Sequence, residues 1–201
     1  MTKIKICGIT NLEDALACVD AGADALGFVL AESPRRVEAE TIKNIVTRLP
    51  KTILKVGIFV NEKLETLQQT VLNCGLDYAQ LQGEESGEYI RRLEVACLKV
   101  FRVKDDGILA EIESAKTNLF MLDAYQDGQR GGTGKIFNWE IAKQAKRHGK
   151  FFLSGGLNPD NVKSAIKKVH PYGVDVSSGV EKFPGKKDLE KVREFIKRVR
   201  E

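Results

Sequence analysis

Two side chains that could exchange protons with a ligand stand at the ends of apolar segments in this 201-residue sequence. Cys7 ends the strand-like segment Lys3–Cys7, and Asp123 stands near the end of Leu119–Ala124. A thiol can act as a base if neighbouring cations or helix ends lower its pKa, and a desolvated carboxyl can act as a proton donor. The same positions also suit an inert buried thiol and a carboxylate that caps its own loop.

Small residues end two later strand-like segments. One segment ends in the serine and two glycines at 154–156, and the next ends in the two serines and glycine at 177–179. Small residues let a phosphate approach backbone N–H groups and a helix N-terminus, so this pair of segments predicts a phosphate site. The glycine-rich stretch 125–136 is also a candidate, because connections of that length are usually functional or disordered.

A pair of arginines, Arg35 and Arg36, follows the second strand-like segment. A guanidinium at that place could hold a planar carboxylate through two parallel hydrogen bonds. A solvated surface charge is the other interpretation of either residue. If one of them does bind a carboxylate, the sequence describes a ligand held by phosphate at one end and carboxylate at the other, with an acid and a base between.

These candidates need a fold that brings strand ends together, and the order of elements predicts one. Short apolar strands alternate with helices eight times, which implies a parallel sheet, and eight regular units fit a closed (β/α)₈ barrel better than an open doubly wound sheet. Reactive residues of such barrels collect at the C-terminal ends of the strands. We expect one domain over residues 1–201, no ninth strand, and strands at 3–7, 25–31, 54–60, 78–83, 98–103, 119–124, 151–156 and 173–178. Among the helices we expect one over 89–96, and one through Leu64 to Gly75 that is capped by Asn61.

The composition limits the classes of function. Lys plus Arg is 32 against 28 for Asp plus Glu, and the resulting charge of +4 is spread along the chain, which argues against a nucleic-acid partner. No apolar run is long enough for a membrane span or signal peptide, and the four cysteines show no CxxC spacing. We therefore expect a cytoplasmic protein with reduced thiols that acts on a small anionic molecule, as a monomer or a homodimer.

Several segments together resemble the phosphoribosylanthranilate isomerase family of tryptophan biosynthesis. They are KICGITNLEDA, GFV with SPR, VGIFVN, QLQGEE, LDA before GGTGKIFNW, LSGGLNPDNV and VDVSSGVEKFPGKKD. The resemblance extends from Lys3 to the last helix. It implies an Amadori rearrangement of N-(5'-phosphoribosyl)anthranilate, an aminoaldose, to 1-(o-carboxyphenylamino)-1-deoxyribulose 5-phosphate, without cofactor or metal.

Roles carried over from the family fall on the residues that match its motifs. Cys7 of KICG would be the base that takes the proton from the sugar C2, and Asp123 of the LD motif would be the acid that protonates the ring oxygen. Arg36 of SPR would hold the anthranilate carboxylate, with Arg35 as the alternative. The glycine and serine segments would bind the phosphate through Gly132, Gly155, Gly156, Ser178 and Gly179.

The sequence leaves the roles of two residues and three alternative functions open. Gln82 stands where the family often has histidine, and its role is undecided; Asp175 is a second candidate for the acid. Another barrel that acts on a phosphorylated sugar is also possible. An indole-glycerol-phosphate synthase should carry catalytic lysines at strand ends, and the aminoaldose isomerase of histidine synthesis should carry an aspartate in place of Cys7. A non-catalytic phosphate-binding barrel would not need Cys7 and Asp123. A thiol redox protein would need a resolving cysteine near Cys7.

Overall fold

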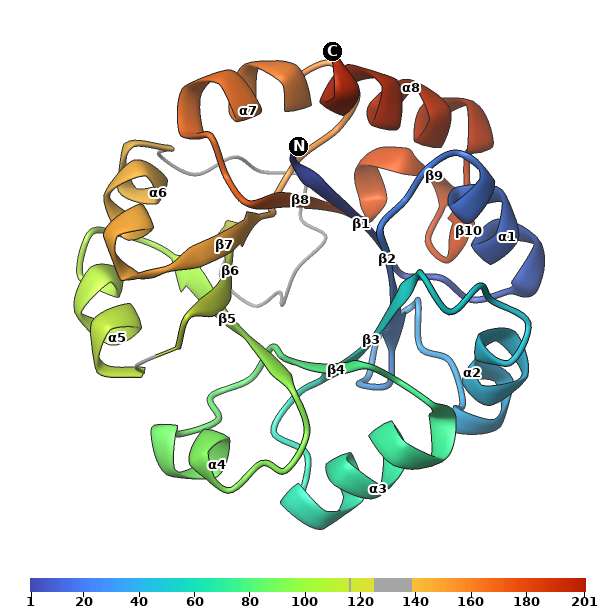
Figure 1. Ribbon diagram of the computed structural model, residues 1–201, viewed down its shortest axis with the longest axis horizontal. Helices are drawn as coiled ribbons and strands as arrows, with labels where there is room; N and C mark the ends of the chain where they lie inside the picture. Colours follow the sequence, from blue (N-terminus) through green and yellow to red (C-terminus); the bar gives the residue numbers. More distant parts are fainter. Residues whose placement is uncertain (116, 125–138) are drawn as a thin grey trace.

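Eight parallel strands form a closed ring in the computed structural model, which describes residues 1–115, 117–124 and 139–201. Each strand pairs with its neighbours in sequence order, and the last pairs with the first (Figure 1). The expected (β/α)₈ barrel is therefore confirmed. The ring consists of β1 (Lys3–Cys7), β2 (Ala25–Val29), β3 (Leu54–Phe59), β4 (Tyr78–Leu81), β5 (Cys97–Val103), β6 (Leu119–Ala124), β7 (Lys150–Leu153) and β8 (Gly173–Val176).

Helices surround the ring, one after each strand in the described residues (Figure 1). Some of their ends carry local signals: the Asn11 side chain accepts a hydrogen bond from the Asp14 N–H at the start of the first helix, and Gly75 ends the third in the left-handed conformation. The helices are α1 (Leu12–Asp20), α2 (Ala39–Val46), α3 (Leu64–Cys74), α4 (Gly87–Arg91), α5 (Ile108–Ala115), α6 (Trp139–Ala145), α7 (Val162–Val169) and α8 (Leu189–Arg200). None of the described helices is long and apolar enough to cross a membrane.

Three local expectations were wrong. The helix expected over 89–96 is only the five-residue α4, which begins after the capping residue Ser86. Asn61, expected to cap α3, instead has a left-handed backbone and accepts a hydrogen bond from the N–H of Glu84. The chain also contains strands beyond the eighth: β9 (Glu181–Phe183) and β10 (Lys186–Lys187) form a hairpin between β8 and α8.

Alternation along the strands divides the side chains between two environments. Ile4 and Ile6 of β1 belong to the large apolar layer between strands and helices. Inside the ring, a separate apolar cluster is built by β5, β6 and β7 from Leu98, Val100, Met121 and Phe152, with Leu119 packed against it. This cluster makes part of the interior apolar, and buried polar side chains come from β1, β4, β5, β6 and β8.

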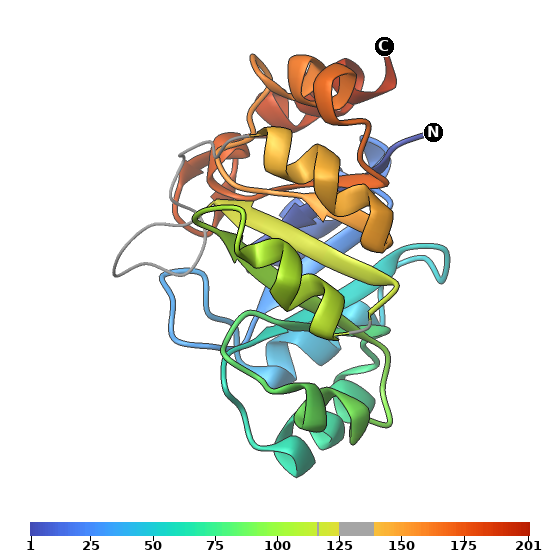
Figure 2. The ribbon, with the colours of Figure 1, turned by 90° about the vertical axis from the view of Figure 1, so that its left-hand side faces the viewer.

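The hairpin is fixed to the open end of the barrel by a buried ionic network. Glu181 of β9 accepts two hydrogen bonds from Arg35 Nε and one from Arg35 Nη2, at 2.7–3.1 Å. Lys187 of β10 donates to Glu181 Oε1 at 2.9 Å and to the backbone oxygen of Cys7 at 2.6 Å. In Figure 2 the two termini lie at the other end, where Arg200 donates to the backbone oxygen of Thr2.

Candidate active site

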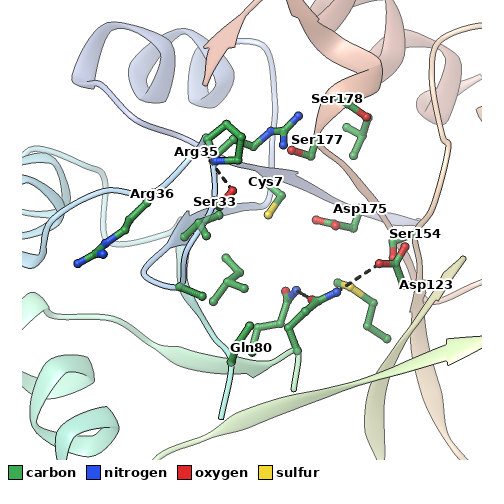
Figure 3. A pocket seen from close by; sticks show the side chains of 18 of the residues that line it. Cys7, Ser33, Arg35, Arg36, Gln80, Asp123, Ser154, Asp175, Ser177 and Ser178 are labelled. Atoms are coloured by element: carbon green, nitrogen blue, oxygen red, sulfur yellow. Dashed lines mark hydrogen bonds between the residues drawn. The ribbon is translucent and has the colours of Figure 1, made fainter. Parts of the chain in front are cut away.

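A cavity of about 1050 Å³ opens at the C-terminal ends of the strands. Its wall brings together Cys7, Arg36, Asp123, Gly155, Gly156 and Ser178 from the expected site, and also both alternatives, Arg35 and Asp175 (Figure 3). Gly179 is not part of the wall but stands directly behind it, and Gly132 lies outside the described residues. These residues come from five strand ends or the loops after them, and they meet in one place, as the barrel topology requires.

Cys7 is buried at the end of β1 and points into the cavity (Figure 3). Its charged neighbours are Lys5 of the same strand, Asp175 of β8, and Lys187 of the hairpin. Burial raises the pKa of the Cys7 thiol, and the negative charge of Asp175 raises it further, while Lys5 and Lys187 act in the opposite direction and leave it raised overall. The thiol is therefore the resting form, and thiolate formation depends on these cations.

Asp123 is buried at the end of β6 and belongs to a chain of side-chain hydrogen bonds. Gln82 donates through Nε2 to Asp123 Oδ2 at 3.2 Å, and Gln80 donates through Nε2 to Gln82 Oε1 at 2.8 Å (Figure 3). Both glutamines are buried and line the cavity. Gln82, whose role the sequence left undecided, thus orients the Asp123 carboxyl, and the buried Oε1 of Gln80 has no hydrogen-bond partner among the described residues.

The two arginines after β2 have different surroundings. Arg35 is committed to the bidentate pair with buried Glu181. Arg36 is exposed, its guanidinium points away from Cys7 in Figure 3, and its partner is the exposed Glu38 at 3.3 Å. An exposed pair of this kind contributes little free energy, so a ligand carboxylate can replace Glu38 at small cost.

Backbone conformation shapes the wall that follows β7 and β8. Gly155 and Gly156 have backbone φ angles of 89° and 67°, which residues other than glycine rarely adopt. A Cβ at Gly179 would collide with the backbone carbonyl of Leu157, so only glycine allows the two loops to pack this closely. Ser177 beside them is half-buried, and its buried hydroxyl oxygen has no partner among the described residues, which leaves it available for a ligand.

Sequence reasoning missed four buried polar groups in or behind the wall. Lys5, Gln80, Glu181 and Lys187 are all buried and polar, and each contacts or neighbours an expected site residue. Lys5 and Gln80 left a signal, because each is two residues from a singled-out side chain in the same expected strand, Cys7 and Gln82 respectively. Glu181 and Lys187 depend on contacts between distant segments that no local pattern reveals.

The family model described as "N-(5'phosphoribosyl)anthranilate (PRA) isomerase" matches residues 4–198 of the chain. A curated relative from Pelobacter propionicus, named N-(5'-phosphoribosyl)anthranilate isomerase, is 52% identical over 202 residues, covering 100% of this chain and 97% of the relative. A relative of the same name from Geobacter sp. strain M21 is 51% identical over 197 residues, covering 98% of this chain and 97% of its own.

Solved structures of this family have the same fold. Phosphoribosyl anthranilate isomerase from Thermotoga maritima superposes with a TM-score of 0.94 at 40% identity, covering 100% of this chain and 99% of that one. A structure of a phosphoribosyl anthranilate isomerase in complex with reduced 1-(o-carboxyphenylamino)-1-deoxyribulose 5-phosphate superposes with a TM-score of 0.91 at 39% identity, with the same coverage.

Proposed function

The chain belongs to the N-(5'-phosphoribosyl)anthranilate isomerase family, and we propose that the isomerisation takes place in this cavity, with Asp123 as the acid and Cys7 as the base. The chain converts N-(5'-phosphoribosyl)anthranilate to 1-(o-carboxyphenylamino)-1-deoxyribulose 5-phosphate, a step of tryptophan biosynthesis. The observation that carries the assignment of the two groups is their placement: a buried carboxyl of β6 and a buried thiol of β1 line the same cavity.

The reaction begins with opening of the furanose ring. Asp123 gives its proton to the ring oxygen, the bond from that oxygen to C1 breaks, and the nitrogen lone pair forms the C1=N double bond. Gln82 holds the carboxyl through Oδ2, which fixes the direction from which the proton is delivered. Such positioned proton transfer contributes roughly 10² to 10⁴ in rate.

The second half of the reaction removes the proton from C2. The Cys7 thiolate takes this proton, and the electrons of the C–H bond form a C1=C2 double bond while the charge on nitrogen is neutralised. The enol then becomes a ketone: its hydroxyl loses a proton and C1 gains one. The hydrogens lost by C2 and its hydroxyl thus equal those gained by the ring oxygen and C1.

We assign the carboxylate end of the substrate to Arg36 rather than Arg35. Replacing Arg36 with alanine should raise KM roughly ten- to hundredfold, because a charge-assisted hydrogen bond is lost, and should change kcat much less. Arg35→Ala should instead destabilise the fold by about 3 kcal/mol, since it leaves buried Glu181 with one fewer partner. Steady-state kinetics and thermal unfolding of both variants measure these effects. A normal KM in Arg36→Ala would exclude this arginine as the clamp.

We assign the phosphate end to the loops after β7 and β8. A Gly179→Ala substitution should push these loops apart and raise KM about tenfold or more, with weaker inhibition by inorganic phosphate. Gly87→Ala is the matched control, because a Cβ there would make only an ordinary contact with Arg91. Unchanged phosphate inhibition in Gly179→Ala would place the anion elsewhere.

The proposed function as a whole is tested by anthranilate fluorescence. Purified protein in EDTA is added to freshly generated phosphoribosylanthranilate, with the Asp123→Asn variant beside it. We expect loss of substrate fluorescence with the wild type alone. No loss with either protein would contradict the function, and equal loss with both would contradict the role of Asp123.

Two further features follow from the same proposal. The described site residues all come from one chain, so we propose that a single copy is active, whether the protein is a monomer or a homodimer. The specific activity should then be independent of protein concentration.

The four cysteines are free thiols, which is typical of proteins in the reducing cytoplasm, and we propose that location for this protein.

A further inference from the structure

We propose that Lys5 is a positioning residue whose ammonium supplies the counter-charge for the Cys7 thiolate, and that Asp175 holds Lys5 in place while opposing the thiolate's charge. The proposal rests on Cys7 as the base of the proposed function. It assigns a role to two buried charged groups that the acid and base steps do not use. Lys5 and Asp175 would act through Cys7 and need not contact the reacting atoms themselves.

The first observation is a buried ion pair across the closing seam of the barrel. Lys5 of β1 and Asp175 of β8 are partners in the parallel register, and both side chains project into the ring. Lys5 Nζ donates to Asp175 Oδ1 at 2.7 Å, and Lys5 is only 1% exposed. The ammonium therefore has no route to water, and its charge must be balanced inside the barrel.

The second observation places the thiol beside the same ammonium. Cys7 is two residues from Lys5 on the same face of β1, and its register partner is Gly27 of β2. A Cβ built on Gly27 would lie 2.9 Å from Cys7 Sγ and 3.0 Å from Lys5 Nζ. Sulfur and ammonium thus flank one point beside the glycine, and the missing side chain is what allows both to lie there.

The third argument is energetic. A buried ion pair seldom stabilises a fold more than apolar side chains of similar volume would, and β5 to β7 show that this barrel can fill its interior with such side chains. Stability alone is therefore a weak explanation for the pair. Since thiolate is the reactive form of cysteine, a fixed cation next to Sγ serves the base directly.

The charges around Cys7 have opposing effects on the formation of its thiolate, and these effects can be tested. Lys5 of β1 and Lys187 of β10 favour the thiolate, and Asp175 of β8 disfavours it. Lys187 is also bonded to Glu181, so its charge is already shared with a carboxylate at 2.9 Å. Lys5 and Asp175 should consequently change the reactivity of the same sulfur in opposite directions.

The experiment measures the rate at which iodoacetamide alkylates Cys7 at pH 8, with each cysteine resolved by mass spectrometry. Below the pKa, each unit of pKa shift changes the rate about tenfold. We expect Lys5→Met to slow alkylation of Cys7 about tenfold or more and Asp175→Asn to accelerate it by a similar factor. A loss of structure would change both variants in the same direction, so opposite changes are specific to the charge arrangement.

Two double variants separate charge from folding. Lys5→Met with Asp175→Asn leaves no uncompensated charge, and because Lys5 has the larger effect on the thiol, alkylation should again be slower than in the wild type. Lys99→Met with Glu85→Gln removes a buried lysine pair, bonded at 2.7 Å, whose charges are not among those that act on Cys7, and it should leave Cys7 alkylation unchanged.

The proposal is overturned if Lys5→Met, alone or in the double variant, leaves the alkylation rate of Cys7 unchanged, or if Asp175→Asn slows it. The readout needs no turnover, so it separates this proposal from the function it rests on. A Cys7 variant with normal turnover would remove the base assignment, whereas the alkylation rates report only on how Lys5 and Asp175 act on the sulfur.

Discussion

Asp123→Asn should lower kcat by roughly 10² to 10⁴, with KM changed less than about threefold. Asparagine has the shape of aspartate but no proton to give to the ring oxygen. Its side-chain oxygen can still accept the hydrogen bond from Gln82 Nε2, now 3.2 Å from the carboxyl, so the buried chain of amides keeps its order. The variant should therefore bind ligand and fold normally while failing to open the ring.

Steady-state kinetics measure this loss, and binding of the reduced product analogue by calorimetry checks that the cavity is intact. Asp77→Asn is a matched control, because Asp77 precedes β4 at the other rim, where its carboxylate accepts a hydrogen bond from the backbone N–H of Lys55. It should change stability but not kcat. If Asp123→Asn kept more than a tenth of the wild-type kcat, the acid would have to be another group, and Asp175 would be tested next.

Cys7→Ala should cause a loss of the same order, roughly 10² to 10⁴ in kcat, because no other group described at this wall combines the position and the proton affinity of a base. The thiol rests in its protonated form, since burial raises its pKa, yet the thiolate is within reach because Lys5 and Lys187 oppose that shift. Substrate affinity should persist, as the proposed contacts to phosphate and carboxylate are made by other residues.

Cys18→Ala provides the control for removing a buried sulfur. Cys18 lies in α1, away from the cavity, and burial raises its pKa to about 12, so it is a packing residue. Its variant should lose some stability and keep its kcat. Turnover of Cys7→Ala close to that of the wild type would remove the thiol from the mechanism.

Local patterns were enough to predict the barrel. Each strand is short and largely apolar, and some helix ends carry clear local signals, such as Asn11 at the start of α1 and Gly75 at the end of α3. The places where prediction failed have a physical cause. The hairpin of β9 and β10 has little apolar alternation, and it is held by Glu181 through Arg35 and Lys187, contacts that join segments distant in sequence.

The residues of the candidate site at strand ends were predictable from the sequence, whereas their partners from distant segments were not. Cys7 and Asp123 could be found because strand ends meet at one rim of a parallel barrel. The choice between Arg35 and Arg36 could not be made, since it depends on which of them faces Glu181. The role of Gln82 was equally hidden, because its partner Asp123 is 41 residues away and lies two strands further along the ring.

The seam between β1 and β8 also determines when the site can come into existence during folding. Lys5 and Asp175 are 170 residues apart, and Lys187 is 180 residues from the Cys7 oxygen that it contacts. Contacts of such high sequence separation form late, after most of the loop-closure entropy has been lost. On the ribosome the strand that bears the thiol emerges first, but its electrostatic environment is completed only after the eighth strand and the hairpin have been synthesised.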